Sequence, residues 1–158
     1  MAKKKKTKPS AEELAASVIK KWEGFMPEPY LCPSGIPTIG YGNTMYENGD
    51  RVAMEDCKVD RKRGAEILEH FISKVRQQVL DVIDVKLKDY QLAALISFTY
   101  NVGIGNLMKS TLLIKLNDNP DDQNIPAEFR RWNKSKGKVL KGLTARREDE
   151  VSLWLGEL

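Results

Sequence analysis

The stretch that decides the fold is residues 22–44, which read WEGFMPEPYLCPSGIPTIGYGNT. Glu23 ends an amphipathic segment, and Gly24 directly after it is the kind of residue that caps the end of a helix. Prolines and glycines are then frequent up to Cys57, a composition typical of turns between short strands. The stretch therefore predicts a helix that ends at Glu23 and a small antiparallel sheet that begins just after it.

Helical patterns lie on both sides of this stretch. A start signal at Ser10 is followed by apolar residues at four-residue spacing up to Trp22. Asp60 opens a long amphipathic helix with an apolar face. Further helices are predicted at 89–102, shortly after Ser110, at about 126–132 and at 144–155. A helix, a sheet and then several helices define the α+β class, because this order does not suit a parallel sheet.

The length and composition indicate one globular domain. The chain has 158 residues, of which 41% are hydrophobic and 30% are charged. We expect a single domain over 10–158, with a sheet lobe at about 24–59 and a helical lobe at about 60–158 that includes the N-terminal helix. Residues 1–9 are lysine-rich and are predicted to form a basic, disordered tail.

The net charge of +4 comes from this tail, because five lysines precede the first acidic residue, Glu12. One later segment, residues 129–147, is also basic. It contains no Asp or Glu and holds Arg130, Arg131, Lys134, Lys136, Lys138, Lys141, Arg146 and Arg147. The segment is either a solvated face or a contact surface for a polyanion, such as nucleic acid or an anionic cell-wall polymer.

Neither a signal peptide nor a membrane span is predicted. The basic N-terminus lacks the apolar core that a signal peptide needs, and no apolar run is long enough to cross a bilayer. We therefore expect a cytoplasmic protein in which Cys32 and Cys57 are reduced and do not pair.

Several common chemistries lack support in the sequence. His70 is the only histidine and falls on the polar side of the long predicted helix, where a solvated surface role is expected. A Ser-His-Asp triad, a Cys-His pair and a histidine-rich metal site are therefore not indicated. The glycines between 35 and 42 do not form a phosphate loop, because no helix follows them. The sequence predicts neither a metal nor a cofactor.

Glu23 is the strongest candidate for chemistry. A carboxylate at a helix C-terminus is unfavourable, since the helix dipole is already negative there. The same field, together with the neighbouring Trp22 and Phe25, favours the protonated form and so a proton donor. The alternative is a glutamate that is merely tolerated at this position.

The predicted strand after Glu23 favours the catalytic alternative. By strand alternation Ile39 and Tyr41 face the core, while one hydroxyl and two glycines face the other way, at Thr38, Gly40 and Gly42. A face without bulky side chains is suited to the close approach of a ligand. The turn at 33–37 is expected to fold Cys32 back alongside Thr38.

These residues resemble the opening of the phage lysozymes of glycoside hydrolase family 24. The resemblance lies in Glu23, Cys32 and Thr38 at the spacing of that family's catalytic triad, within the surrounding Trp-Glu-Gly-Phe and Thr-Ile-Gly-Tyr-Gly motifs. It continues over essentially the whole chain after the tail, in blocks at 97–103, 110–113, 129–132 and 142–147. The resemblance implies a lysozyme-like fold in which the long helix joins the two lobes, with a cleft between them.

By the same resemblance, the chain is expected to be an endolysin that hydrolyses the β-1,4 bond between N-acetylmuramic acid and N-acetylglucosamine. Glu23 is then the general acid, and Cys32 and Thr38 orient the attacking water. The residues expected to bind substrate are Tyr41, Tyr100, Asn101 and Arg147. Arg147, or else Arg146, is expected to lie near Glu23.

The sequence departs from the family pattern in two places. Asn43 stands where many relatives carry His, which we expect to affect stability rather than function. Cys32 stands where the family often has Asp, and a thiol with its ordinary pKa is mostly protonated at neutral pH. Glu28, Glu47 and Asp50 are candidates for a substitute carboxylate, but are expected to be solvated loop charges.

The resemblance also implies the partners. They are peptidoglycan as substrate and a pore-forming protein (holin) that releases a monomeric enzyme from the host cytoplasm, with no role for nucleic acid. The rival hypothesis is a non-catalytic module that binds wall polymer or nucleic acid through its basic segment and tail. A turbidity assay on permeabilised cells separates the two.

Overall fold

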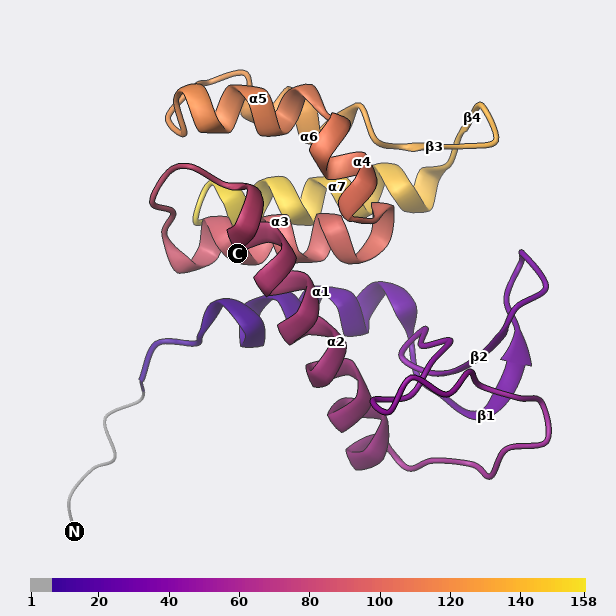
Figure 1. The fold of residues 1–158 in the computed structure, drawn as a ribbon. Helices are drawn as coiled ribbons and strands as arrows, with labels where there is room; N and C mark the ends of the chain where they lie inside the picture. The colour runs from indigo at the N-terminus through magenta and orange to yellow at the C-terminus, as the bar shows by residue number, and fades with distance from the viewer. Residues whose placement is uncertain (1–6) are drawn as a thin grey trace, which may run out of the picture.

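The computed structural model describes residues 7–158 (Figure 1). Most of the predicted basic tail lies outside the described residues. Residues 7–9 precede the first helix as exposed coil. The elements in chain order are α1 (Ala11–Glu23), β1 (Met26–Leu31), β2 (Pro37–Gly40), α2 (Arg61–Val82), α3 (Asp89–Val102), α4 (Ile104–Lys109), α5 (Thr111–Asp118), α6 (Ile125–Arg130), β3 (Lys134–Ser135), β4 (Lys138–Val139) and α7 (Lys141–Trp154). The predicted α+β class is confirmed.

Helix α1 has the ends that the sequence predicts. The Ser10 hydroxyl accepts a hydrogen bond from the backbone N–H of Glu13 at 3.1 Å, which satisfies one free donor of the first turn. At the other end Gly24 has φ +67°, and its N–H donates to the Lys20 carbonyl at 3.0 Å. This positive φ is accessible to glycine at little cost and turns the chain sharply into β1. Glu23 is thereby fixed at the junction of the helix and the sheet lobe.

Strands β1 and β2 form an antiparallel hairpin in which Tyr30 lies opposite Thr38. Its turn is closed by two backbone hydrogen bonds, from the N–H of Gly35 to the Cys32 carbonyl at 2.8 Å and from the N–H of Cys32 to the Ile36 carbonyl at 3.0 Å. The prediction that this turn folds Cys32 back toward Thr38 is confirmed. The rest of the sheet lobe contains turns and isolated bridges.

Helix α2 joins the two lobes: it packs against β2 in the sheet lobe and against α1, α3 and α4 in the helical lobe (Figure 1). Asp60 caps its start by accepting a hydrogen bond from the N–H of Arg63 at 2.7 Å. Helix α3 is the centre of the helical lobe, because α1, α2 and α7 all pack on it. Its residues Leu92–Thr99 are buried without interruption. Burying each large apolar side chain stabilises the fold by about 1.5–3 kcal/mol.

Three features of the helical lobe differ from the prediction. Helix α4 was not predicted, because Gly103 and Gly105 interrupt the apolar pattern. The β3–β4 hairpin was also missed, since its strands have two residues each and its turn places Lys136 at φ +49°. Helix α7 begins at Lys141, three residues before the predicted start at Thr144. No helix in residues 7–158 combines the length and the apolar character needed to cross a membrane.

Candidate active site

Glu23 lies between an arginine of α7 and a glycine turn of the sheet lobe. Arg146 Nη1 donates a hydrogen bond to Glu23 Oε1 at 2.9 Å, and the Glu23 side chain is 25% exposed. On its other side, a Cβ built at Gly42 would lie 2.5 Å from Glu23 Oε2, too close for any side chain. Gly42 also has φ +77°, a conformation that favours glycine. The carboxylate is therefore held by contacts from both lobes, while the Glu23 side chain as a whole remains partly exposed to solvent.

The glycines of the motif Thr38–Gly42 serve a different purpose from the predicted one. Gly40 lies against the backbone of α2, where a Cβ added to it would be 3.6 Å from the Gly64 Cα, and Gly42 makes room for Glu23. Thr38 is only 2% exposed. Thr38 and Gly40 therefore do not form the predicted open, ligand-facing surface, because both are buried; of the three positions, Gly42 borders a pocket described below. The expected core positions of Ile39 and Tyr41 are confirmed by their burial. For the same reason the Tyr41 side chain is not open to a substrate, which corrects the binding role that the resemblance implied for it.

Cys32 and Thr38 come together across the β1–β2 turn. The Thr38 hydroxyl donates to the Ile36 carbonyl at 2.8 Å, and the half-buried Cys32 thiol lies beside the same turn. The backbone N–H groups of Ile36 and Ser34 lower the pKa of the Cys32 thiol, and hydrogen bonding to Thr38 acts in the same direction. The expectation of a thiol with its ordinary pKa is therefore corrected, because the turn favours the thiolate.

Tyr30 is a member of this site that the sequence reasoning missed. Burial raises the pKa of its hydroxyl, and the negative charges of Glu23 and then Cys32 raise it further. Both groups therefore lie within electrostatic range of this one hydroxyl. The strand register could have revealed it, because a hairpin with its turn at 33–37 places Tyr30 opposite Thr38.

Tyr100 reaches the site from the end of α3. Its hydroxyl accepts a hydrogen bond from Asn43 Nδ2 at 3.0 Å and donates to the Tyr41 carbonyl at 3.3 Å. Burial raises the pKa of Tyr100, and the charge of Glu23 adds to the effect, so the phenol is neutral. A pocket of about 240 Å³ opens here. It is lined by Gly42, Asn43, Thr44, Met45, Phe71, Val75 and Tyr100. Gly42 connects this pocket to Glu23.

The structure corrects the prediction for the two arginines. Arg146 is the partner of Glu23, whereas Arg147 is fully buried and cannot contact a ligand as expected. Arg147 donates to Asn101 Oδ1 at 3.0 Å and to the Trp132 carbonyl at 3.3 Å, and its guanidinium lies 5.1 Å from the centre of the Phe98 ring. Asn101 itself is exposed at the end of α3.

The basic segment 129–147 is only half available to a partner. Its arginines are engaged in ion pairs: Arg130 with Glu148 at 2.6 Å, Arg131 with Glu128 at 3.2 Å, Arg146 with Glu23, and Arg147 with Glu150. The exposed lysines have no ion pair in the part of the chain that the structure describes. They are Lys134, Lys136, Lys138 and Lys141, and we refer to residues 134–141 as the lysine hairpin.

The other candidate residues are either exposed or engaged in local contacts with their neighbours. Two hydrogen bonds from Arg63, at 2.6 and 2.8 Å, lower the pKa of Glu47 and engage both of its oxygens. Glu28 is exposed on β1, and Asp50 Oδ2 accepts a hydrogen bond from Asn48 at 2.9 Å. His70 is half-buried against Phe71 rather than fully solvated. Within residues 7–158 no group of three potential metal-ligating acidic, Cys or His side chains occurs.

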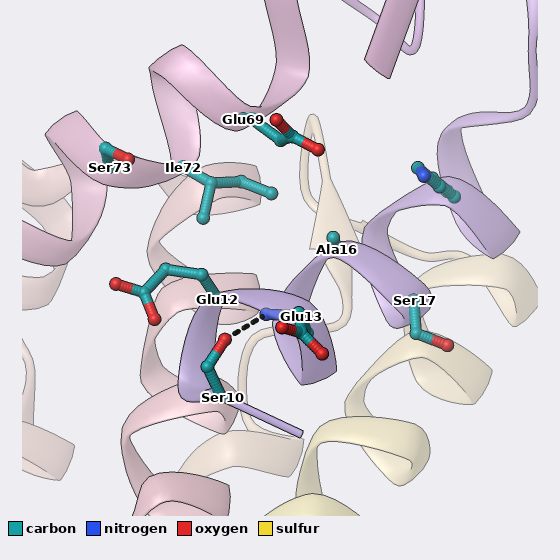
Figure 2. A pocket seen from close by; sticks show the side chains of 9 residues that line it. Ser10, Glu12, Glu13, Ala16, Ser17, Glu69, Ile72 and Ser73 are labelled. Carbon is teal, nitrogen blue, oxygen red and sulfur yellow. Dashed lines mark hydrogen bonds between the residues drawn. The ribbon is translucent and has the colours of Figure 1, made fainter. Parts of the chain in front are cut away.

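A groove of about 710 Å³ lies between α1 and α2, along the first turns of α1 rather than at Glu23 (Figure 2). Its acidic side chains are Glu12, Glu13 and Glu69. Glu12 pairs with Arg76 at 2.8 Å, so part of this negative charge is already balanced. The groove brings together no acid and base in a catalytic arrangement.

The fold and the arginine-bound glutamate define a lysozyme-like protein, and comparisons with known proteins lead to the same class. A family model described as phage lysozyme matches residues 20–150. The endolysin of Bacillus phage B103 is 37% identical over 145 residues, which are 88% of this chain and 51% of that protein, so the chain spans about half of this relative. The SAR-endolysin of bacteriophage PS119 is 36% identical over 136 residues, covering 84% of this chain and 77% of that protein.

Solved structures are similar over nearly the full length. The endolysin from Escherichia coli O157:H7 phage FAHEc1 has a TM-score of 0.85 at 29% identity, covering 96% of this chain and 97% of that one. A mutant of P22 lysozyme has a TM-score of 0.77 at 29% identity, covering 89% and 94%. The chain belongs to the phage lysozyme family, a family of lysozyme-type glycoside hydrolases. The resemblance found in the sequence is thereby confirmed.

Proposed function

We propose that the protein is an endolysin that cleaves the β-1,4 bond between N-acetylmuramic acid and N-acetylglucosamine in peptidoglycan. The observation that carries this proposal is the position of Glu23. It lies at the junction of the two lobes, contacts Arg146 and Gly42, and has a side chain that is 25% exposed to solvent. Such a group can meet a glycosidic oxygen without rearrangement of the fold.

In the proposed reaction Glu23 acts as the general acid. It transfers its proton to the leaving glycosidic oxygen as the bond to the anomeric carbon breaks, and a water molecule attacks that carbon. The proton that this water loses passes to solvent, from which Glu23 is protonated again. Cys32 and Thr38 orient this water. The lowered pKa of the Cys32 thiol supports a role as hydrogen-bond acceptor, because a thiolate accepts more strongly than a thiol.

We assign the sugar chain to the surface next to Glu23. The pocket lined by Gly42, Asn43 and Tyr100 has room for part of a sugar residue and contains both apolar and hydrogen-bonding groups. Tyr41 supports this pocket through the hydrogen bond to its backbone carbonyl, and exposed Asn101 continues the surface beyond Tyr100. The lysine hairpin adds an electrostatic contact to the anionic wall.

We further propose that the protein acts as a monomer and reaches the wall from the host cytoplasm through a pore made by a separate protein. Neither nucleic acid nor a cofactor takes part in the proposed reaction. The names of several relatives, such as the SAR-endolysin of bacteriophage PS119, belong to those proteins and do not assign a release route to this chain.

The test is the clearing of bacterial suspensions, with intact and with permeabilised cells. Native protein should clear only permeabilised cells, and Glu23→Gln should lower the rate by about two to four orders of magnitude, because an amide is not acidic enough to protonate the leaving oxygen. Glu28→Gln, which changes an exposed carboxylate of β1, is the matched control and should retain full activity. A Glu23→Gln variant with near-native activity would contradict the assignment. Binding to walls without clearing would favour the non-catalytic module instead.

A further inference from the structure

Glu23 belongs to a row of four ionisable groups that extends from the surface into the core. Arg146 pairs with Glu23 at 2.9 Å and lies 3.8 Å from Glu150 through its Nε. Glu150 in turn pairs with Arg147 at 2.6 Å. The row contains two carboxylates and two guanidinium groups, so its formal charge is zero when all four are ionised.

The inner half of the row is fixed by the core. Glu150 and Arg147 are both fully buried, and the Ser97 hydroxyl donates to Glu150 Oε2 at 2.7 Å. Burial raises the pKa of Glu150, whereas Arg147, Ser97 and Arg146 act in the opposite direction and favour the charged form. A buried charge without its partner is strongly unfavourable, so this pair is retained as a unit.

The outer half is held less firmly. Arg146 is 5% exposed, yet its Nε and Nη2 have no hydrogen-bond partner among the described residues. Its firm contact is therefore the hydrogen bond from Nη1 to Glu23. How strongly the two arginines together stabilise the Glu23 carboxylate then depends on how much of their charge Glu150 offsets.

The remaining groups around Glu23 do not supply that offset. Tyr30 from β1 and Tyr100 from α3 both have raised pKa values and stay neutral. On α1 itself, Lys21 is paired with Asp149 at 2.8 Å, and Lys20 lies over the Tyr41 ring at 5.5 Å. The Cys32 thiol in the β1–β2 turn is the exception, because its pKa is lowered and its thiolate carries a negative charge; it is the same in every variant compared below.

We propose that Glu150 is a positioning residue for the Glu23–Arg146 pair. Its buried carboxylate offsets the charge of Arg147, so that Glu23 meets the net field of a single arginine. Glu150 thereby sets the upper pH limit at which Glu23 still carries the proton to be donated. This inference rests on the proposed function, because it concerns the protonation of the same general acid.

Three variants test the proposal, because they should shift the upper limb of the pH–activity profile down, up and not at all. Glu150→Gln removes the offsetting charge and stabilises the Glu23 carboxylate, so the upper limb of the pH–activity profile should move down by roughly one pH unit. Arg147→Met removes a positive charge while keeping an apolar stem over Phe98, so the limb should move up. The double variant Glu150→Gln/Arg147→Met removes one charge of each sign and should return the limb to its native position. Replacing both buried partners also protects folding where a single change does not.

Glu148→Gln is the control on the same helix, because Glu148 pairs with exposed Arg130 and lies outside the row. A purely structural role for Glu150 would lower the folded fraction but leave the limb in place. An unmoved limb in folded Glu150→Gln, or a double variant that stays shifted, would overturn the proposal.

A second measurement does not depend on activity. The Glu23 carboxyl can be followed by ¹³C NMR in glutamate-labelled protein, with its signal assigned by its loss in Glu23→Gln. Its titration should move to lower pH in Glu150→Gln and to higher pH in Arg147→Met. If the native protein fails to clear permeabilised cells, the proposed function fails. If clearing is normal but neither titration nor limb moves, only the role of Glu150 fails.

Discussion

The β1–β2 hairpin and the lysine hairpin come from different lobes and have opposite organisation. In the first, polar groups are directed inward: Thr38 donates to the Ile36 carbonyl, and the backbone of the turn stabilises the Cys32 thiolate. In the second, the lysine side chains are exposed and free of ion pairs within residues 7–158. Figure 1 shows both hairpins projecting toward the same side of the view.

Under the proposed function, this difference separates two kinds of contact with the peptidoglycan polymer. A turn with internal hydrogen bonds holds a reacting group in a fixed geometry, as catalysis requires. Exposed lysines on long, flexible side chains provide attraction that does not depend on exact geometry and weakens with salt. We therefore expect changes in the first hairpin to affect the rate of bond cleavage, and changes in the second to affect binding.

The largest effect is expected at Cys32. Alkylation of its thiol should lower the clearing rate by about 100-fold or more, because the added group occupies the place of the attacking water. Since the turn lowers the pKa of this thiol, alkylation should remain fast below the pH at which an ordinary thiol reacts. Cys32→Asp should stay within about tenfold of native activity, because a carboxylate can orient the same water.

The exposed Cys57 provides the control for this experiment. Protein in which only Cys57 is modified should clear cells normally, and both cysteines are free in the structure. Full activity of Cys32→Ala would identify Cys32 as a packing residue. The catalytic assignment would then shrink to Glu23 and Thr38.

Gly42 is expected to have the second largest effect. Gly42→Ala places a methyl group 2.5 Å from Glu23 Oε2 and forces a non-glycine residue to φ +77°. We expect a loss of about 1–3 kcal/mol in unfolding free energy from the backbone. We also expect a fall of about 10²-fold in activity from the displaced carboxylate.

Gly49→Ala separates these two contributions. Gly49 has φ +90°, but a Cβ there would meet no atom within 4 Å. This variant should show the loss of stability in thermal unfolding while keeping native activity per folded molecule. Equal losses of activity in the two variants would show that contact with Glu23 is unimportant.

The sequence predicted helix α1 and the inward-facing hairpin well, because both are specified by short-range sequence signals. The capping serine, the glycine after Glu23 and the turn at 33–37 each specify backbone conformation within a few residues. The use of the glycines was misjudged for a different reason. A Cβ-free position indicates a close approach, but the sequence does not say whether a ligand or another part of the chain makes it.

Short-range sequence signals could not decide which arginine pairs with Glu23. Arg146 and Arg147 are neighbours in sequence but lie about 100° apart around a helix, so one faces Glu23 and the other faces the core. The rotation of α7 is set by tertiary packing, including the contact of Arg147 with Phe98. The basic character of residues 134–141 was recognised, but the β3–β4 pairing was missed because two-residue strands rich in lysine carry no alternating apolar pattern.

The smallest effect is expected at the lysine hairpin and concerns binding alone. A variant with Lys134, Lys136, Lys138 and Lys141 all changed to Gln should bind isolated cell walls roughly tenfold more weakly at low salt. Sedimentation with walls measures this in a Glu23→Gln background, so that the walls stay intact. Because the screening length falls to about 8 Å near physiological salt, the difference from the parent should shrink as salt is added.

Net charge must be matched for this prediction to test the hairpin itself. Changing Lys58, Lys62, Lys74 and Lys86 to Gln removes the same charge from exposed positions between the end of the sheet lobe and the loop after α2. This control should bind walls nearly as well as the parent if the attraction is concentrated at the lysine hairpin. Equal weakening in both variants would assign the attraction to overall charge and remove the hairpin from wall binding. The contrast between an inward-facing hairpin proposed for catalysis and an outward-facing hairpin proposed for binding would then lose its second half, while the assignment of Glu23 would be unaffected.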